Sequence, residues 1–149
     1  MNIKISIEYD NSQIPVVGKL VHHLCVIGDT EHHPSVNRIE LAVVELLTNI
    51  ISYSGAGETD SLIEIHCQFK GGDFDVIVTS GGEALSSELA REYANDNVCM
   101  PDIDTGIGDL PESGWGIQLI KSACDKVSYQ RVENKNVYKL AFDLSAEIV

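Results

Sequence analysis

A carboxylate and a carboxamide stand four residues apart in an otherwise apolar stretch of the chain, at Glu45 and Asn49. Apolar residues recur around them at helical spacing, so we expect the two side chains to lie one above the other on one face of a helix. A carboxylate in such a place can accept a proton, and an amide oxygen can hold a hydrated cation. The same pair is also common on solvated helix faces, so by itself it leaves both interpretations open.

Two glycine-rich segments could bring phosphate groups close to the main chain. Ser80-Gly81-Gly82 ends a run of alternating apolar residues, and Gly114 and Gly116 flank a tryptophan where a helical pattern begins. The exposed N–H groups of a helix start attract phosphate, and glycine lets it approach because it has no side chain. A plain tight turn would explain the same glycines. No GxxxxGK[ST] run is present, which excludes a P-loop.

The elements that must position these residues follow from the periodicity. Alternating apolar residues predict five strands, over 2–9, 63–69, 74–78, 127–131 and 137–144, with a turn at 133–136 between the last two. Helical spacing predicts four helices, over 14–28, 38–54, 86–95 and 116–125, with Asn11-Ser12 as a turn before the first and Ser35 as the N-cap of the second. Mostly antiparallel strands with every helix on one face give an α+β two-layer sandwich, which we expect to form one domain over residues 1–149.

The composition limits the classes of partner. The chain has 149 residues, 44% of them hydrophobic, and a net charge of −13, which opposes binding to nucleic acid or to an anionic membrane surface. A protein partner or a cation-chelated ligand suits this charge better. No apolar run approaches the length that spans a bilayer, and the first residues alternate rather than form a signal-peptide core, so we expect a cytoplasmic protein.

Cysteines and histidines do not indicate a metal site. The four cysteines lie far apart without a CxxC pair, which argues against structural zinc and suits a reducing compartment. They are Cys25, Cys67, Cys99 and Cys124. Neighbouring residues point in different directions on a helix, so we interpret the pairs His22-His23 and His32-His33 as surface features.

Taken together and in order, these segments resemble the N, G1 and G2 boxes of the GHKL ATP-binding superfamily, and most closely those of the bacterial anti-sigma factor serine/threonine kinases. The segment from Glu45 to Ser54 resembles the E-x-x-x-N helix, and Gly114 to Ile120 resembles the G-x-G-[hydrophobic]-x-L-[hydrophobic] box. Asp125 to Tyr129 is similar to the stretch that follows in that branch. The resemblance covers nearly the whole chain, and the combination is specific where each part is weak.

The resemblance implies a Bergerat, or histidine-kinase-like, ATPase fold that binds ATP with Mg²⁺. It implies that Asn49 coordinates the Mg²⁺ that bridges the phosphates, and that Glu45 is the general base for an acceptor serine hydroxyl or for water. Gly114 and Gly116 would receive the phosphates, with the loop over 96–116 as a lid. A STAS-type anti-anti-sigma protein, a sigma factor, or both would be the partners. The branch often works as a homodimer.

The G1 box departs from the family pattern. Counting in twos from Phe74 to Val78, the position of the adenine-binding aspartate falls on Ser80 and that of its glycine on Gly82, with Leu85 where this branch often has phenylalanine. A hydroxyl lacks the charge-assisted strength of a carboxylate. The loss is worth about 1–3 kcal/mol, roughly ten- to a hundredfold in affinity.

A literal DxGxG sequence begins at Asp104, but no strand precedes it and it lies too near Gly114 to leave room for a lid. We interpret it as lid sequence, and a contact of Asp104 with a nucleotide stays an alternative.

Three functions remain open at this stage. The first is an ATP-dependent serine/threonine protein kinase of the anti-sigma regulatory type. The second is a binding module of the same fold that binds nucleotide poorly or not at all and acts by sequestration. The third is a generic α+β domain in which the boxes are coincidental.

Overall fold

The computed structural model describes residues 1–26, 35–53, 62–95 and 115–144. These residues form five strands and four α-helices, with a short 3₁₀ helix, η1 (Asn11–Gln13), before the first α-helix. The strands are β1 (Asn2–Ile7), β2 (Ile63–Lys70), β3 (Asp73–Ser80), β4 (Lys126–Val132) and β5 (Lys135–Asp143). The helices are α1 (Ile14–Cys25), α2 (Ser35–Tyr53), α3 (Ser87–Ala94) and α4 (Trp115–Ala123).

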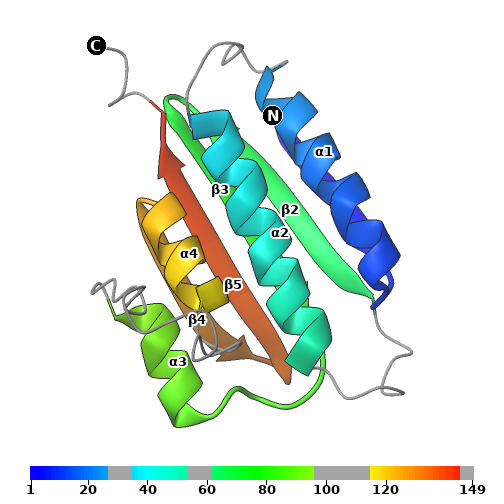
Figure 1. Ribbon diagram of the computed structural model, residues 1–149, viewed down its shortest axis with the longest axis vertical. Helices are drawn as coiled ribbons and strands as arrows, with labels where there is room; N and C mark the ends of the chain where they lie inside the picture. Colours follow the sequence, from blue (N-terminus) through cyan, green and yellow to red (C-terminus); the bar gives the residue numbers. More distant parts are fainter. Residues whose placement is uncertain (27–34, 54–61, 96–114, 145–149) are drawn as a thin grey trace, which may run out of the picture.

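The strands form one sheet in the order β1-β2-β3-β5-β4, in which all neighbours are antiparallel. Alternate residues of β3 and β5 are buried on a single face, as the period of two requires. Helices α1, α2 and α4 lie across that face (Figure 1). Helix α3 joins them there, since its Tyr93 packs on Tyr138, one of the buried residues of β5. The predicted α+β two-layer sandwich is confirmed.

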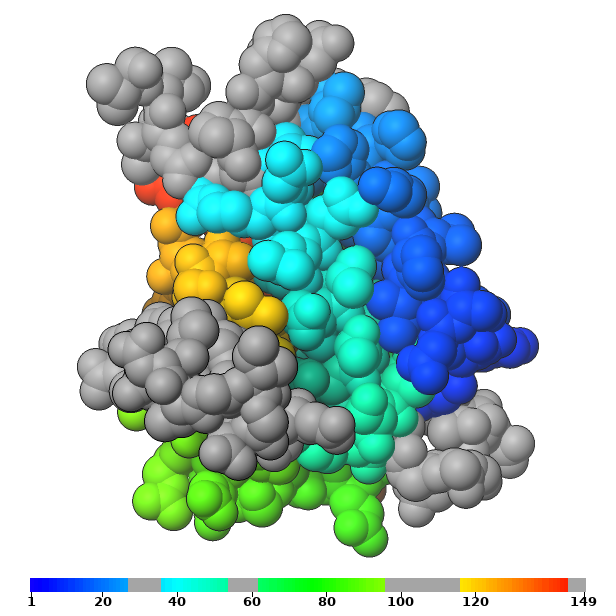
Figure 2. Space-filling view, viewed as in Figure 1, coloured from blue at the N-terminus to red at the C-terminus, as the bar shows by residue number. Residues whose placement is uncertain are grey.

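Helix α2 forms the centre of the helical layer, between α1 and α4, with α3 at one end of the molecule (Figure 2). Its buried residues recur at helical spacing and belong to the same core as the aromatic residues of the sheet, where the rings of Phe74 and Phe142 lie 6.2 Å apart. The buried residues of α2 are Val36, Ile39, Ala42, Val43, Leu46, Leu47 and Ile50. Because most of the circumference of α2 is buried, its few polar side chains are held in defined places.

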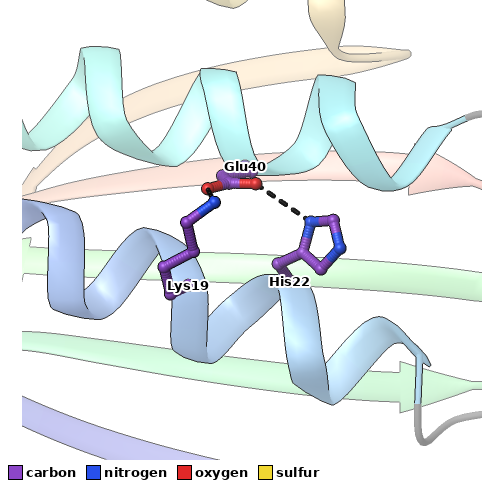
Figure 3. A network of polar contacts seen from close by, with 3 residues as sticks. All are labelled: Lys19, His22 and Glu40. Atoms are coloured by element: carbon purple, nitrogen blue, oxygen red, sulfur yellow. Dashed lines mark hydrogen bonds and ion pairs between the residues drawn. The ribbon is translucent and has the colours of Figure 1, made fainter.

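The contact between α1 and α2 is both close and charged. At Gly18 an added Cβ would stand 2.8 Å from Val44 Cγ2, so the glycine allows the helices to approach. Beside it, Glu40 of α2 accepts a hydrogen bond from Lys19 at 3.1 Å and contacts His22 Nδ1 at 2.9 Å (Figure 3). Burial acts to raise the pKa of Glu40, but the contacts with Lys19 and His22 outweigh it, so the pKa of Glu40 is lowered. The half-buried His22 therefore joins two helices, whereas His23 is exposed, as expected of a surface feature.

The prediction of Ser35 as the N-cap of α2 stays a prediction, because the residue before it lies outside the described residues. Two other local predictions need correction. The segment Asn11–Gln13 is a 3₁₀ helix, in which the backbone N–H of Gln13 donates to the carbonyl of Asp10 at 3.0 Å and the Asp10 carboxylate caps the N–H of Ser12. The turn between β4 and β5 contains only two residues, Glu133 and Asn134, both with positive φ. The strand β5 therefore starts at Lys135, and the next residue is an inward-facing residue of the sheet.

The expectations about membrane spans, cysteines and histidines can be compared with the described residues only. No helix in the described residues is long and apolar enough to cross a membrane. Cys25, Cys67 and Cys124 are buried, and burial raises the pKa values of their thiols to about 12, 11 and 12. Cys99 and the pair His32-His33 lie outside the described residues.

Candidate functional site

A cavity of about 400 Å³ opens where β3 ends. The ends of several elements surround it: the segment after β1, the C-terminal turn of α2, the loop over 81–86, the start of α3 and the start of β5. The lining residues are Tyr9, Ile50, Tyr53, Ser80, Gly81, Gly82, Glu83, Ala84, Leu85, Ser86, Leu89, Asn136 and Tyr138. Aromatic and aliphatic walls with a few polar groups, at this volume, are typical of a small-molecule site.

Ser80 is a buried residue of the cavity lining. It is the last residue of β3, is 2% exposed, and faces the same way as Phe74, Val76 and Val78, as the count in twos predicts. Its neighbour across the sheet is Asn136. A serine hydroxyl can both donate and accept a hydrogen bond, so it offers a polar contact to a ligand without a charge.

Gly82 also lines the cavity, and its backbone conformation explains the residue type. Its φ is +89°, which side chains rarely tolerate, and this conformation turns the chain away from the end of β3. On one side of this turn the backbone N–H of Gly81 donates to Tyr9 Oη at 2.9 Å. On the other side Arg131 donates to the Gly82 carbonyl at 2.8 Å. This loop is thus hydrogen-bonded to both edges of the sheet, to the segment after β1 through Tyr9 and to β4 through Arg131.

Asn136 is the centre of a hydrogen-bond network behind the same loop. It is 4% exposed, and its Nδ2 donates to the carbonyl of Glu83 at 2.9 Å. Its Oδ1 accepts from Tyr129 Oη at 2.6 Å and from Arg131 Nη1 at 3.1 Å. The hydroxyl of Tyr129 in turn accepts from the backbone N–H of Leu85 at 3.1 Å. Because a buried amide with these partners is costly to disturb, the loop has its shape before any ligand binds.

Asn49 is not among the residues that line this cavity and lies instead where α2 meets the first turn of α4. An added Cβ on Gly116 would stand 2.7 Å from Asn49 Oδ1 and 3.0 Å from its Nδ2, so the amide occupies the space that the glycine leaves. The Nδ2 donates to Tyr93 Oη of α3 at 3.3 Å. The structure therefore brings Asn49 and Gly116 together, although they are far apart in the sequence.

Glu45 stands one helical turn before Asn49 on α2 and is half-buried. Three of the sequence-predicted features cannot be placed. Gly114, Asp104 and the lid over 96–114 lie outside the described residues. Trp115 and Gly116 form the first turn of α4, so this part of the predicted loop is helix.

These features define a class of protein: an α+β sandwich in which strand ends and helix ends enclose a ligand-sized cavity, with an amide packed against a glycine at a helix start. A family model described as Histidine kinase-like ATPase domain matches residues 29–142. The chain belongs to this family, and ATP binding is the function that the match supports. No curated protein matches the chain.

The residues around Asn49 suit a magnesium nucleotide. Mg²⁺ prefers oxygen ligands and is usually held by one or two protein groups together with phosphate oxygens. The amide Oδ1 of Asn49 is an oxygen donor of this kind, and the absence of a side chain on Gly116 leaves room for it at the start of a helix, where phosphate is favoured. In the described residues no three His, Cys, Asp or Glu side chains gather into a metal site.

Sequence reasoning missed the residues that hold the site together. Asn136 was assigned to a turn, and Tyr93, Tyr129 and Arg131 were given no role. One signal was available, because counting back in twos from Leu140 and Tyr138 places Asn136 on the buried face. The hydrogen bonds of the tyrosines and of the arginine join segments that are far apart in the sequence, so no local sequence pattern predicts them.

Proposed function

We propose that the chain is an ATP-binding serine/threonine protein kinase of the anti-sigma regulatory type, which phosphorylates or sequesters a protein partner. The observation that supports it best is the packing of the Asn49 amide against Gly116, with Glu45 one turn away on the same helix. In this proposal one helix carries the metal ligand and the base, and the glycine-rich helix start receives the phosphates.

When bound, MgATP would supply the transferable phosphoryl group and the positive charge that neutralises it. Asn49 would hold the cation through its Oδ1, for which Gly116 leaves room. The backbone N–H groups at the start of α4, after Gly114, would receive the phosphates. Glu45 takes the proton of an acceptor hydroxyl at its carboxylate. Ser80 and Gly82 bind the base in the cavity, whose loop is already shaped by Asn136.

The proposed partners are a STAS-type anti-anti-sigma protein, a sigma factor, or both. The net charge of −13 supports a protein partner over nucleic acid or an anionic membrane. We further propose that residues 1–149 act as one cytoplasmic domain. The resemblance leaves open whether the chain acts alone or as a homodimer.

A second candidate is a binding module of the same fold that regulates its partner by sequestration alone. Ser80 favours it, because a buried hydroxyl replaces a carboxylate at the base of the cavity. The two candidates differ in nucleotide affinity and in turnover, not in fold.

The test combines isothermal titration with MgATP and phosphate transfer from labelled ATP to a purified STAS-domain protein. Asn49→Ala should raise the Mg²⁺ concentration needed for nucleotide binding, and Glu45→Gln should abolish transfer while leaving nucleotide affinity intact. Glu64→Gln is the matched control, because this exposed glutamate lies on the sheet face away from the helices. Binding without transfer by the wild-type chain would favour the second candidate, and unaltered transfer by Glu45→Gln would remove Glu45 from the base role.

A further inference from the structure

Three tyrosine rings stack between the cavity loop and Asn49. Tyr129 of β4 and Tyr138 of β5 have ring centroids 5.2 Å apart, and Tyr138 and Tyr93 of α3 have theirs 5.3 Å apart. Tyr93 and Tyr129 are themselves 6.5 Å apart. Aromatic pairs at these separations and tilts attract each other and lock one another's rotamers. The two outer rings are thus fixed relative to the sheet.

The hydroxyl at one end of the stack holds the cavity loop. Tyr129 Oη accepts from the backbone N–H of Leu85 at 3.1 Å and donates to Asn136 Oδ1 at 2.6 Å. Asn136 also bonds the carbonyl of Glu83, so one tyrosine and one amide fix both ends of the cavity wall. This hydroxyl lies on the side of the cavity where Ser80 lies.

The hydroxyl at the other end holds Asn49. Tyr93 is 4% exposed, and its Oη accepts from Asn49 Nδ2 at 3.3 Å. Burial raises the pKa of Tyr93 to about 12, so the hydroxyl keeps its proton at neutral pH. Because Nδ2 is directed to Tyr93, the other amide atom, Oδ1, is directed away from it. The bond therefore holds the amide in place between α3 and the start of α4, where both of its polar atoms lie beside Gly116.

We propose that Tyr93 and Tyr129 are positioning residues for the two halves of the nucleotide site. Tyr93 holds the Asn49 amide in place beside Gly116, and Tyr129 sets the shape of the loop that receives the adenine base. This inference rests on the proposed function, and it adds that the two halves are held by separate hydroxyl groups. Losing either hydroxyl should therefore affect one half alone.

The test is a pair of conservative variants, Tyr93→Phe and Tyr129→Phe, each of which keeps its ring in the stack and serves as the control for the other. Isothermal titration measures their affinities for three probes: adenosine, ATP with Mg²⁺, and ATP with EDTA. Adenosine reports the base half alone, and the difference between the two ATP conditions reports the metal half. Thermal unfolding confirms that each variant is folded.

For Tyr93→Phe we expect the affinity for MgATP to fall about two- to tenfold, the range set by one neutral hydrogen bond. The affinities for adenosine and for ATP with EDTA should stay at the wild-type values. For Tyr129→Phe we expect all three affinities to fall by one common factor of the same size. A general loss of packing would lower all affinities in both variants, so it cannot produce this split.

A second measurement needs no nucleotide. The side-chain amide protons of Asn49, followed by NMR in the free protein, should exchange with water faster in Tyr93→Phe than in the wild type, and should be unaffected in Tyr129→Phe. Unchanged exchange in Tyr93→Phe would overturn the inference. So would a Tyr93→Phe variant that keeps the wild-type Mg²⁺ dependence of ATP binding. A wild-type chain that binds neither adenosine nor MgATP overturns the proposed function, and this inference with it.

Discussion

Gly116→Ala adds a single methyl group at the point where α4 meets the Asn49 amide. The new Cβ would stand 2.7 Å from Asn49 Oδ1, and ordinary contact begins at 3.4 Å, so the amide must withdraw by about 0.7 Å. The Nδ2 is 3.0 Å from the same position and cannot move closer. The amide therefore leaves its place between α4 and Tyr93.

The expected cost in stability is small, because two terms oppose each other. Losing the hydrogen bond to Tyr93 costs about 0.5–1.5 kcal/mol, and replacing glycine by alanine in a helix gains up to about 1 kcal/mol. The free energy of unfolding should thus change by less than about 1 kcal/mol.

The affinity for MgATP should change more than the stability. A contact between a neutral oxygen and a cation is worth about 1.5–3 kcal/mol, so MgATP should bind roughly ten- to a hundredfold more weakly.

Urea denaturation gives the free energy of unfolding, and isothermal titration with ATP, in Mg²⁺ and in EDTA, gives the affinities. Ser122→Ala is the matched control, because it changes an exposed residue of the same helix. A Gly116→Ala variant that is folded and binds MgATP with the wild-type affinity would refute the reasoning. Stability lost without any change in affinity would show that the glycine serves packing only.

Three further predictions concern the base half of the site and the contact between α1 and α2. Ser80→Asp should tighten ATP binding by roughly ten- to a hundredfold if this residue contacts the base, and an unchanged dissociation constant would contradict that contact. Gly18→Ala should lower the free energy of unfolding in urea by about 1–2 kcal/mol, because crowding against Val44 outweighs the gain in helix propensity; a more stable variant would contradict this. The lowered pKa of Glu40 means that its contribution to stability is present above its ordinary value of 4.5 and is lost as pH falls through the lowered value. Denaturation midpoints should therefore fall more steeply below about pH 4.5 in the wild type than in Glu40→Gln, and parallel curves would contradict this role of Glu40.

Periodicity predicted most of the fold because the helices and strands have one buried face each. In β3, the alternation of Phe74, Val76 and Val78 fixed which face Ser80 would take, and the structure has it there. In α2, the helical spacing left Asn49 outside the set of buried apolar residues, and the structure has its amide against Gly116 of α4. Such predictions need only local sequence, since a period of 2.0 or 3.6 determines the face.

The hydrogen bonds around the cavity could not be predicted in the same way. Asn49 and Tyr93 are 44 residues apart in the sequence, and so are Leu85 and Tyr129. Their contacts depend on how α3 sits against β4 and β5, which no local pattern describes. The error at Asn136 has a different cause, because four polar residues in a row were assigned to one turn where the turn needs only two.

The register of β3 against β5 connects the fold to the site. Ser80 and Asn136 are paired in this register, and both face the helices from the last rung before the chain turns away. A shift of one residue in either strand would place that strand's member of the pair on the opposite face of the sheet. A shifted β3 would remove Ser80 from the cavity, and a shifted β5 would remove the amide that holds the loop over 81–86. The same pairing that buries Phe74 and Leu140 therefore also forms the cavity. A variant that shifts this register would lose the cavity even if the sheet still formed.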